Sequence, residues 1–240
     1  MTRIAMISGP RNISTTMMRA FENRPDMSVF DEPFYGCYLK ETGALHPMRD
    51  EVMASLPTQW EEVARDLNTA PSDNHTHIFE KHIAFHFTKM APLDWLEGRK
   101  IFLLIRDPRA MVASYNRKYD DVAPIKDSLV FQVALYKKYF ANSTKLPVFD
   151  ARDILKNPGK MMQNLCDALN IPFDDAMLSW PAGRRESDGV WAPHWYDAVE
   201  KSTGFNEYTE KTIELEKFLE KIAADCMPDY EYLYERRVGL

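Results

Sequence analysis

The chain has 240 residues, of which 45% are hydrophobic and 28% charged, the composition of a globular protein long enough to bury one good core. Its formal net charge of −6 argues against a broad nucleic-acid-binding face, because such faces are normally basic. We therefore expect no nucleic-acid partner. Net charge does not exclude a local cationic pocket, since it says nothing about where the arginines lie.

The cysteine content and the hydropathy pattern predict a cytoplasmic protein. Cys37, Cys166 and Cys226 are far apart in the sequence and odd in number, which indicates reduced thiols rather than a disulfide framework. No segment approaches the ~20 apolar residues that cross a bilayer, and the first apolar stretch is too short for a signal peptide. The sequence thus predicts no membrane partner, and it leaves a homodimer open.

Short apolar runs alternate with amphipathic segments along the chain. Strands are expected at residues 4–7, 27–30, 77–83, 100–105 and 147–150. Helices are expected at residues 14–23, 59–67, 107–119, 128–141, 158–169 and 210–225, with a polar loop at 68–76. The last helix is predicted to carry Ile213, Phe218, Leu219 and Ile222 on one side.

This alternation predicts an α/β fold with three layers, in which helices flank a central, mainly parallel sheet. The chain has no internal repeat, low-complexity tract or linker, so we expect a single domain over residues 1–240. Ligands of such sheets bind beyond the carboxyl ends of the strands. The segments that follow the strands are therefore where functional residues are expected.

The first strand is followed by the turn Gly9-Pro10-Arg11-Asn12-Ile13-Ser14-Thr15-Thr16 and then by a helix. A strand, a tight turn and a helix start direct free backbone N–H groups at one point, which suits phosphate or sulfate. Arg11 adds a guanidinium, and the three hydroxyl residues add donors. In the alternative interpretation, Ser-Thr-Thr only caps the helix and Arg11 is solvated. The turn is not a Walker A loop, which needs a second glycine followed by lysine.

The fourth predicted strand ends at Arg106, and Asp107-Pro108 then begins a helix. Ser114 lies two turns into that helix. An anion held between the strand end and the helix would touch both Arg106 and Ser114. In the alternative interpretation, Arg106 pairs with a nearby acid and Ser114 is a small packing residue.

Together, the stretch Pro10-Arg11-Asn12-Ile13-Ser14-Thr15 and the pair Arg106 and Ser114 resemble the sulfotransferases that use 3′-phosphoadenosine 5′-phosphosulfate (PAPS) and release 3′,5′-ADP (PAP). The match is closer to the bacterial branch and the plant aminotransferase-like relatives than to the cytosolic phenol enzymes. It implies a P-loop-NTPase-like fold and transfer of a sulfuryl group to a hydroxyl or amine of a small-molecule acceptor. It further implies that one set of residues holds the 5′-phosphosulfate, namely Arg11, Asn12, Ile13, Ser14, Thr15 and Thr16, and that Arg106 and Ser114 hold the 3′-phosphate.

Two features depart from the family pattern. Ile13 stands where the family usually has glycine or serine, so it can contact the anion only through its backbone. The family often completes the 3′-phosphate site with an Arg-Lys-Gly loop near its C-terminus. Here that role is open to Arg184 or Arg185, but the interpretation as ordinary exposed arginines is favoured over it.

Sulfuryl transfer needs a base for the acceptor proton and cations on the leaving phosphate. By resemblance, Arg11 would supply the cation. Glu32, which follows the second strand, is one candidate base, since burial against neighbouring aromatic residues would raise its pKa. His82 is the other, because residues 79–86 resemble the Lys-Thr-His-Leu-Pro segment of the cytosolic enzymes. A structural role is open for each.

The remaining candidates concern metal and acceptor. His75, His77, His82 and His86 are close in sequence but match no zinc motif, so no metal is required. Several aromatic residues are candidates for an acceptor pocket: Tyr35, Tyr38, Trp191, Trp195 and Tyr196. Two rival functions remain, a P-loop-type nucleotide-dependent kinase and a non-catalytic module that binds PAP without turnover.

Overall fold

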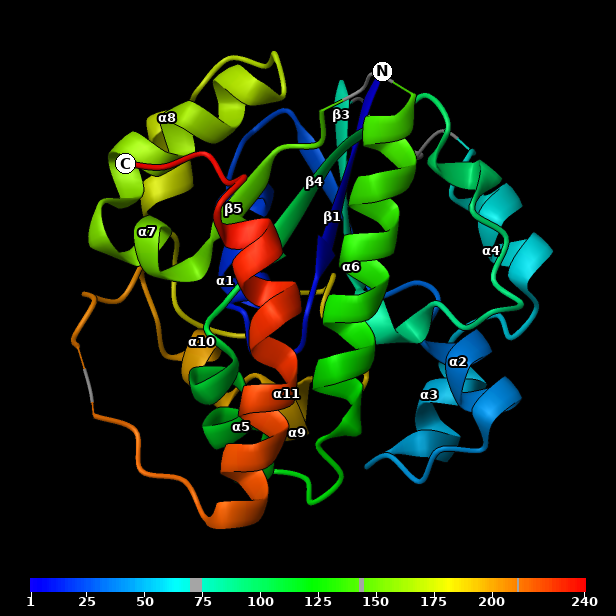
Figure 1. The fold of residues 1–240 in the computed structure, drawn as a ribbon. Helices are drawn as coiled ribbons and strands as arrows, with labels where there is room; N and C mark the ends of the chain where they lie inside the picture. The colour runs from blue at the N-terminus through cyan, green and yellow to red at the C-terminus, as the bar shows by residue number, and fades with distance from the viewer. Residues whose placement is uncertain (70–74, 143–144, 211) are drawn as a thin grey trace.

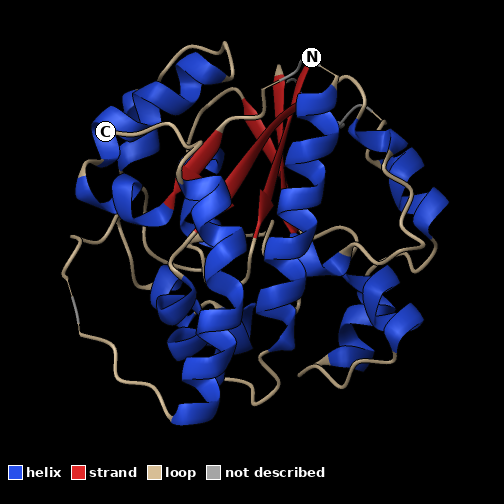
Figure 2. Ribbon diagram, in the orientation of Figure 1, coloured by secondary structure: helices blue, strands red, loops and turns tan. Residues whose placement is uncertain are grey.

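A computed structural model describes residues 1–69, 75–142, 145–210 and 212–240. Within these residues, all strands belong to one sheet with the order β2-β3-β1-β4-β5, and every pairing is parallel (Figures 1 and 2). The strands are β1 (Thr2–Ser8), β2 (Met27–Asp31), β3 (His77–Ile83), β4 (Lys100–Ile105) and β5 (Val148–Asp150). The predicted parallel sheet is confirmed, and all five predicted strands are present.

Helices cover both faces of this sheet, because side chains alternate along each strand. Ala5 and Ile7 of β1 belong to the core that lies under α6 (Ala123–Ala141) and α11 (Lys217–Tyr234). These two helices run side by side over the face of the sheet that is nearer the viewer in Figure 1.

The opposite face of the sheet is equally apolar. Ile4 and Met6 of β1 pack in a second core with α1 (Ser14–Glu22) and α8 (Pro158–Ala168). The molecule therefore has the three layers that the sequence predicts. No described helix is long and apolar enough to cross a membrane.

Shorter helices lie mainly around the carboxyl end of the sheet. They are α2 (Tyr35–Thr42), α3 (Arg49–Ser55), α4 (Trp60–Asp66), α5 (Pro108–Asn116), α7 (Ala151–Lys156), α9 (Ala192–Trp195) and α10 (Asp197–Glu200), together with 3₁₀ turns at Ala84–His86, Asp94–Leu96 and Asp175–Leu178. The sequence predicted α4 and α5 but missed the other five, which are eight residues or shorter and whose apolar faces are too short to show a clear period.

Two helix boundaries differ from the prediction. The helix expected at 128–141 begins at Ala123, where Pro124 occupies the first turn and has no N–H to lose. The helix expected at 210–225 is α11, which begins only at Lys217, so Ile213 lies before the helix and not on its inner face. The helix continues to Tyr234 because its buried side chains recur beyond residue 225, as at Cys226 and Tyr230. Phe218 is 65% exposed, so the predicted inner face was wrong there. Residues 70–74 of the expected loop, and residue 211, lie outside the described residues.

Buried amides fix the ends of the two central strands. Gln132 of α6 donates from Nε2 to the carbonyl oxygens of Ile7 (2.9 Å) and Leu104 (3.0 Å). Asn12 donates from Nδ2 to the same Leu104 oxygen at 3.0 Å. Because Ile7 and Leu104 lie near the carboxyl ends of β1 and β4, these bonds set the relative position of the turns that follow both strands.

We predict that Gln132→Leu destabilises the protein by about 1–3 kcal/mol, since two buried carbonyl groups lose a donor. Gln163→Leu is the matched control, because Gln163 forms an exposed hydrogen bond with Asp167 on α8, and it should change the stability by less than about 0.5 kcal/mol. Urea unfolding monitored by circular dichroism measures both. Equal effects of the two variants would contradict the role assigned to Gln132.

Candidate functional site

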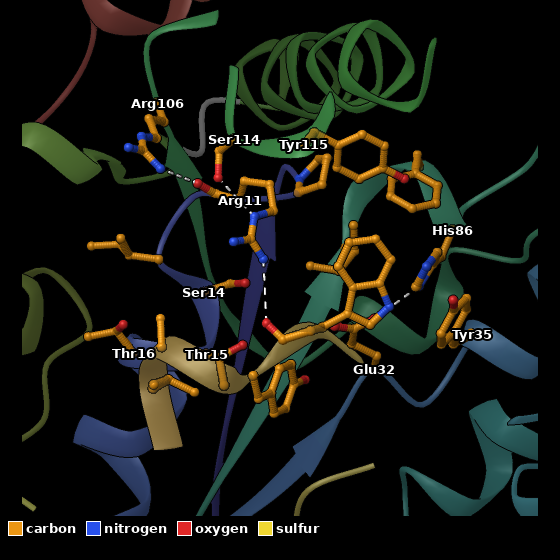
Figure 3. A pocket seen from close by; sticks show the side chains of 18 of the residues that line it. Arg11, Ser14, Thr15, Thr16, Glu32, Tyr35, His86, Arg106, Ser114 and Tyr115 are labelled. Atoms are coloured by element: carbon orange, nitrogen blue, oxygen red, sulfur yellow. Dashed lines mark hydrogen bonds and ion pairs between the residues drawn. The ribbon is translucent and has the colours of Figure 1, made fainter. Parts of the chain in front are cut away.

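A cavity of ≈ 220 Å³ lies at the carboxyl end of the sheet, as expected for a parallel α/β fold. Its walls come from the turn after β1, the ends of β3 and β4, helix α5 and the segment 195–206. Figure 3 shows Arg106 toward one end of this cavity, Tyr35 and His86 toward the other, and Arg11 between them. Most of the site residues predicted from the sequence line it: Arg11, Ile13, Ser14, Thr15, Thr16, Glu32, Arg106 and Ser114.

The turn after β1 has an unusual backbone. Arg11 (φ 61°) and Ile13 (φ 58°) both adopt left-handed conformations. For a β-branched residue such as Ile13 this conformation costs on the order of 1–3 kcal/mol. Alternating backbone conformations of this kind form concave sets of N–H groups that bind anions. The strained backbone of this turn is therefore of a kind that suits the binding of an anion.

Helix α1 starts at this turn without a side-chain cap. The interpretation in which Ser14, Thr15 and Thr16 only cap the helix is therefore wrong. The first N–H groups of α1 and the positive end of its dipole are left to face the cavity, together with the side chains of these three residues. This arrangement suits a phosphate or sulfate group.

The side chain of Asn12 does not line the cavity, in contrast to the prediction. It is fully buried, and its amide binds the Leu104 carbonyl oxygen beneath the turn. Asn12 thus holds the turn against β4, and the cavity is lined by residues on either side of it.

Arg11 and Arg106 meet at the centre of the site. Arg11 donates from Nε to Ser114 Oγ (3.0 Å), and Arg106 donates from Nη1 to the backbone oxygen of Arg11 (2.6 Å). Within the described residues, neither guanidinium forms an ion pair with a carboxylate. Burial lowers the pKa of both arginines, and repulsion from Arg106 and Arg117 lowers the pKa of Arg11 further. Asp107 and Asp150 favour the charge of Arg106 from a distance, but neither carboxylate is paired with a guanidinium that lines the cavity.

Glu32 lies across the cavity from these arginines and is 9% exposed. Its Oε1 accepts a hydrogen bond from Lys81 Nζ at 2.7 Å, and its backbone has φ 46°, so it too is held in a left-handed conformation. Burial raises the pKa of Glu32 despite the neighbouring ammonium. A carboxylate with a raised pKa is a better proton acceptor near neutral pH.

His86 is a cavity residue that the sequence singled out only as a possible metal ligand. Its Nδ1 lies 3.9 Å from Glu32 Oε2, and its ring stacks on Tyr35 with centroids 4.5 Å apart. Burial lowers the pKa of His86 well below its usual range, so the imidazole is neutral. Among the described residues, no group of three His, Cys, Asp or Glu side chains is arranged to hold a metal ion.

His82 does not reach the cavity, so its position does not support it as a base. Its ring packs against Phe34, Phe87 and Trp95 in the core, with Nε2 3.5 Å from a carboxylate oxygen of Glu80. Successive side chains of β3 point to opposite faces of the sheet. Lys81, the preceding residue, takes the position beside Glu32, and His82 therefore faces the core.

Arg184 and Arg185 also lie away from the cavity. Arg184 is exposed, and Arg185 binds the Pro181 carbonyl oxygen through its side chain and Asp188 through its backbone N–H. Instead, the segment that follows closes the site, since Trp195 and Tyr196 line the cavity. The sequence placed both among its aromatic candidates, as it did Tyr35.

Residues 1–236 match the sulfotransferase domain family, so the chain belongs to this family and the resemblance predicted from the sequence is confirmed.

The chain is similar to two Arabidopsis thaliana proteins. It is 32% identical over 226 residues to branched-chain-amino-acid aminotransferase-like protein 2, covering 94% of this chain and 40% of that protein. It is 36% identical over 199 residues to branched-chain-amino-acid aminotransferase-like protein 1, covering 83% of this chain and 36% of that protein. The chain thus spans about two fifths of the length of these curated relatives.

The fold is also that of a solved sulfotransferase from Alicyclobacillus acidocaldarius. The two structures align with a TM-score of 0.54 at 11% sequence identity, covering 99% of this chain and 97% of the other. At this level of identity the similarity concerns the fold alone.

The buried histidine His46 leads to a prediction about acid stability. Burial lowers the pKa of His46, whose Nδ1 is 2.8 Å from Tyr35 Oη, to about 4. The folded protein therefore favours the neutral imidazole, whereas the unfolded chain takes up the proton near pH 6.5. Stability from this group is complete above that pH and is lost as the pH falls toward 4, by about 2 kcal/mol at pH 4.5.

Urea unfolding of the wild type and His46→Asn at pH 7.5 and pH 4.5 measures this effect. The loss of stability between the two pH values should be smaller in the variant by about 2 kcal/mol. An identical loss in both proteins would show that His46 does not titrate in the way its burial implies.

Proposed function

We propose that the protein transfers a sulfuryl group from PAPS to a hydroxyl or amine of a small-molecule acceptor. The observation that carries this proposal is that Arg11 and Arg106, which follow neighbouring strands, line one cavity without a carboxylate partner. An anionic nucleotide with a charged group at each end would supply the direct ion pairs that the two arginines lack among the described residues. PAPS would supply the activated sulfuryl group and be released as PAP.

The residues at the donor end fit such an anion. The uncapped N-terminus of α1, with Ser14, Thr15 and Thr16, would bind the 5′-phosphosulfate, and Arg11 would place positive charge on the leaving oxygen. Arg106 and Ser114 would bind the 3′-phosphate. Ser114 Oγ accepts a hydrogen bond from Arg11, so its own hydroxyl hydrogen remains available as a donor.

Glu32 is the proposed base, because it lines the cavity and its pKa is raised by burial. Its carboxylate would take the acceptor proton, and neutral His86 beside it would keep the acceptor hydroxyl oriented. Tyr35, Phe85 and Trp195 surround this end of the cavity. A carboxylate on the acceptor body would be buried among these rings without its own cation, so we expect uncharged acceptors.

The two rival functions make different demands on the site. A kinase of the P-loop type binds its nucleotide with magnesium and a loop lysine, and the turn after β1 lacks that lysine. A non-catalytic module would bind PAP without transfer. Transfer of the sulfuryl group to an acceptor therefore distinguishes an enzyme from such a module.

We predict that PAP stabilises the wild type, because it binds the folded protein alone. At 100 times the dissociation constant the gain is about 2.7 kcal/mol, which raises the melting temperature by roughly 5–10 °C for a chain of this size. EDTA should not change the shift, whereas ATP with magnesium should produce little. Thermal-shift titration measures each case.

Arg106→Ala should weaken PAP binding by about 10- to 100-fold, since a charge-assisted hydrogen bond is lost. Arg184→Ala is the matched control, because Arg184 is exposed and does not line the cavity. It should bind PAP as the wild type does. No shift of the wild type at millimolar PAP would argue strongly against the proposed function.

A further prediction separates binding from transfer. Glu32→Gln keeps the size of the side chain but removes the base, so PAP affinity should stay within about threefold while transfer falls by about 10²–10⁴-fold. Transfer is followed with ³⁵S-labelled PAPS and a panel of small alcohols and amines. Undiminished transfer by Glu32→Gln would exclude Glu32 as the base.

A further inference from the structure

Asp31 is a buried carboxylate directly beside the proposed base, at the end of β2. It does not line the cavity. It accepts hydrogen bonds from Lys81 Nζ (2.7 Å), Tyr196 Oη (2.7 Å) and the backbone N–H of Gly189 (3.2 Å). Its charge is therefore compensated by three donors from two segments of the chain, the end of β3 and the segment 189–196.

Glu32 is compensated less well than Asp31. Both carboxylates share one ammonium, because Lys81 Nζ lies 2.7 Å from an oxygen of each. Lys81 is itself 1% exposed and donates a third hydrogen bond to Tyr196 Oη, so water contributes little to solvating its ammonium group. One cation cannot neutralise two adjacent carboxylates, and the one with fewer donors remains the more basic.

The other polar groups around Glu32 add no positive charge. Tyr35, Tyr115 and Tyr196 are buried phenols whose pKa values burial raises, so they remain neutral. His86, on the turn at Ala84–His86, is neutral as well and lies 3.9 Å from Glu32. Burial raises the pKa of Glu32 most, and among the charged neighbours Lys81 lowers it while Asp31 raises it.

We propose that Asp31 is a positioning residue that acts on Glu32 through Lys81. Asp31 accepts one of the hydrogen bonds of the Lys81 ammonium, so this ammonium interacts less strongly with the base. This inference rests on the proposed role of Glu32 as the base. With Asp31 ionised, Glu32 is basic enough to take a proton from an acceptor at neutral pH. Asp31 also binds Gly189 and Tyr196, so the same carboxylate ties the segment that closes the cavity to the end of β2.

Two substitutions should move the titration of Glu32 in opposite directions. Asp31→Asn keeps the shape and an acceptor oxygen but removes the competing charge, so Lys81 stabilises ionised Glu32 and its pKa falls by one unit or more. Tyr196→Phe removes a donor from Asp31, which then depends more on Lys81, and the pKa of Glu32 rises. A merely structural role for Asp31 would not produce this opposition.

The test is a carboxyl-carbon NMR titration of protein labelled with [δ-¹³C]glutamate, with Glu32→Gln used to assign the Glu32 signal. Asp153→Asn is the matched control. Asp153 lies on α7, away from the cavity, and it is buried and paired with Arg237. It should leave the Glu32 midpoint unchanged. If Asp31→Asn does not fold, Tyr196→Phe alone decides the sign.

A Glu32 midpoint that does not fall in Asp31→Asn, or that falls in Tyr196→Phe, would overturn the inference. So would a wild-type midpoint near the ordinary glutamate value of about 4.3. The titration needs neither acceptor nor PAPS, so it is independent of the PAP thermal shift. Absence of PAP binding would overturn the proposed function, but the effect of Asp31 on the Glu32 titration midpoint could still be measured.

Discussion

Two half-buried guanidinium groups without a carboxylate partner are the constraint on which this site depends. Arg106 donates to the backbone oxygen of Arg11, and Arg11 donates to Ser114, so both cations are fixed by neutral oxygens. Each keeps its charge at a cost, because burial and repulsion from neighbouring arginines both oppose it. A folded protein tolerates two such cations when other interactions offset the unfavourable free energy of placing them together. The arrangement also favours an anion that contacts both guanidinium groups.

The buried hydrogen bonds and packing below the cavity provide this stabilisation. β1 and β4 are neighbours in the sheet, and Gln132 and Asn12 fasten their carboxyl ends to one another. The turn after β1 can then adopt two left-handed residues, Arg11 and Ile13, because the strands and α1 hold both of its ends. The strain is local, and the free energy gained by packing the hydrophobic cores on both faces of the sheet offsets it.

Much of the fold could be predicted from the sequence, because the five strands are short apolar runs that are separated by recognisable longer helices. The two anion-binding segments were found for a related reason: Arg11 and Arg106 follow predicted strands, and parallel strands bring their carboxyl ends to one edge. The donor end of the cavity was therefore readable from local patterns. The single domain over residues 1–240 stays a prediction.

The acceptor end was less predictable, because it depends on contacts between distant segments. His82, the second candidate base, was singled out by the resemblance of residues 79–86 to a family segment, and that resemblance does not show which face of β3 a side chain takes. The roles of Lys81, Asp31 and Tyr196 arise only when the ends of β2 and β3 meet the segment 189–196. Arg184 and Arg185 were singled out by charge alone, and charge does not show which way a loop faces.

The most direct test of the account is a crystal structure of the protein with PAP. The account predicts the 5′-phosphate against the N-terminus of α1, beside Arg11, and the 3′-phosphate between Arg106 and Ser114, within the one cavity. PAP bound elsewhere, or bound in the cavity with Arg106 and Ser114 contacting neither phosphate, would contradict it.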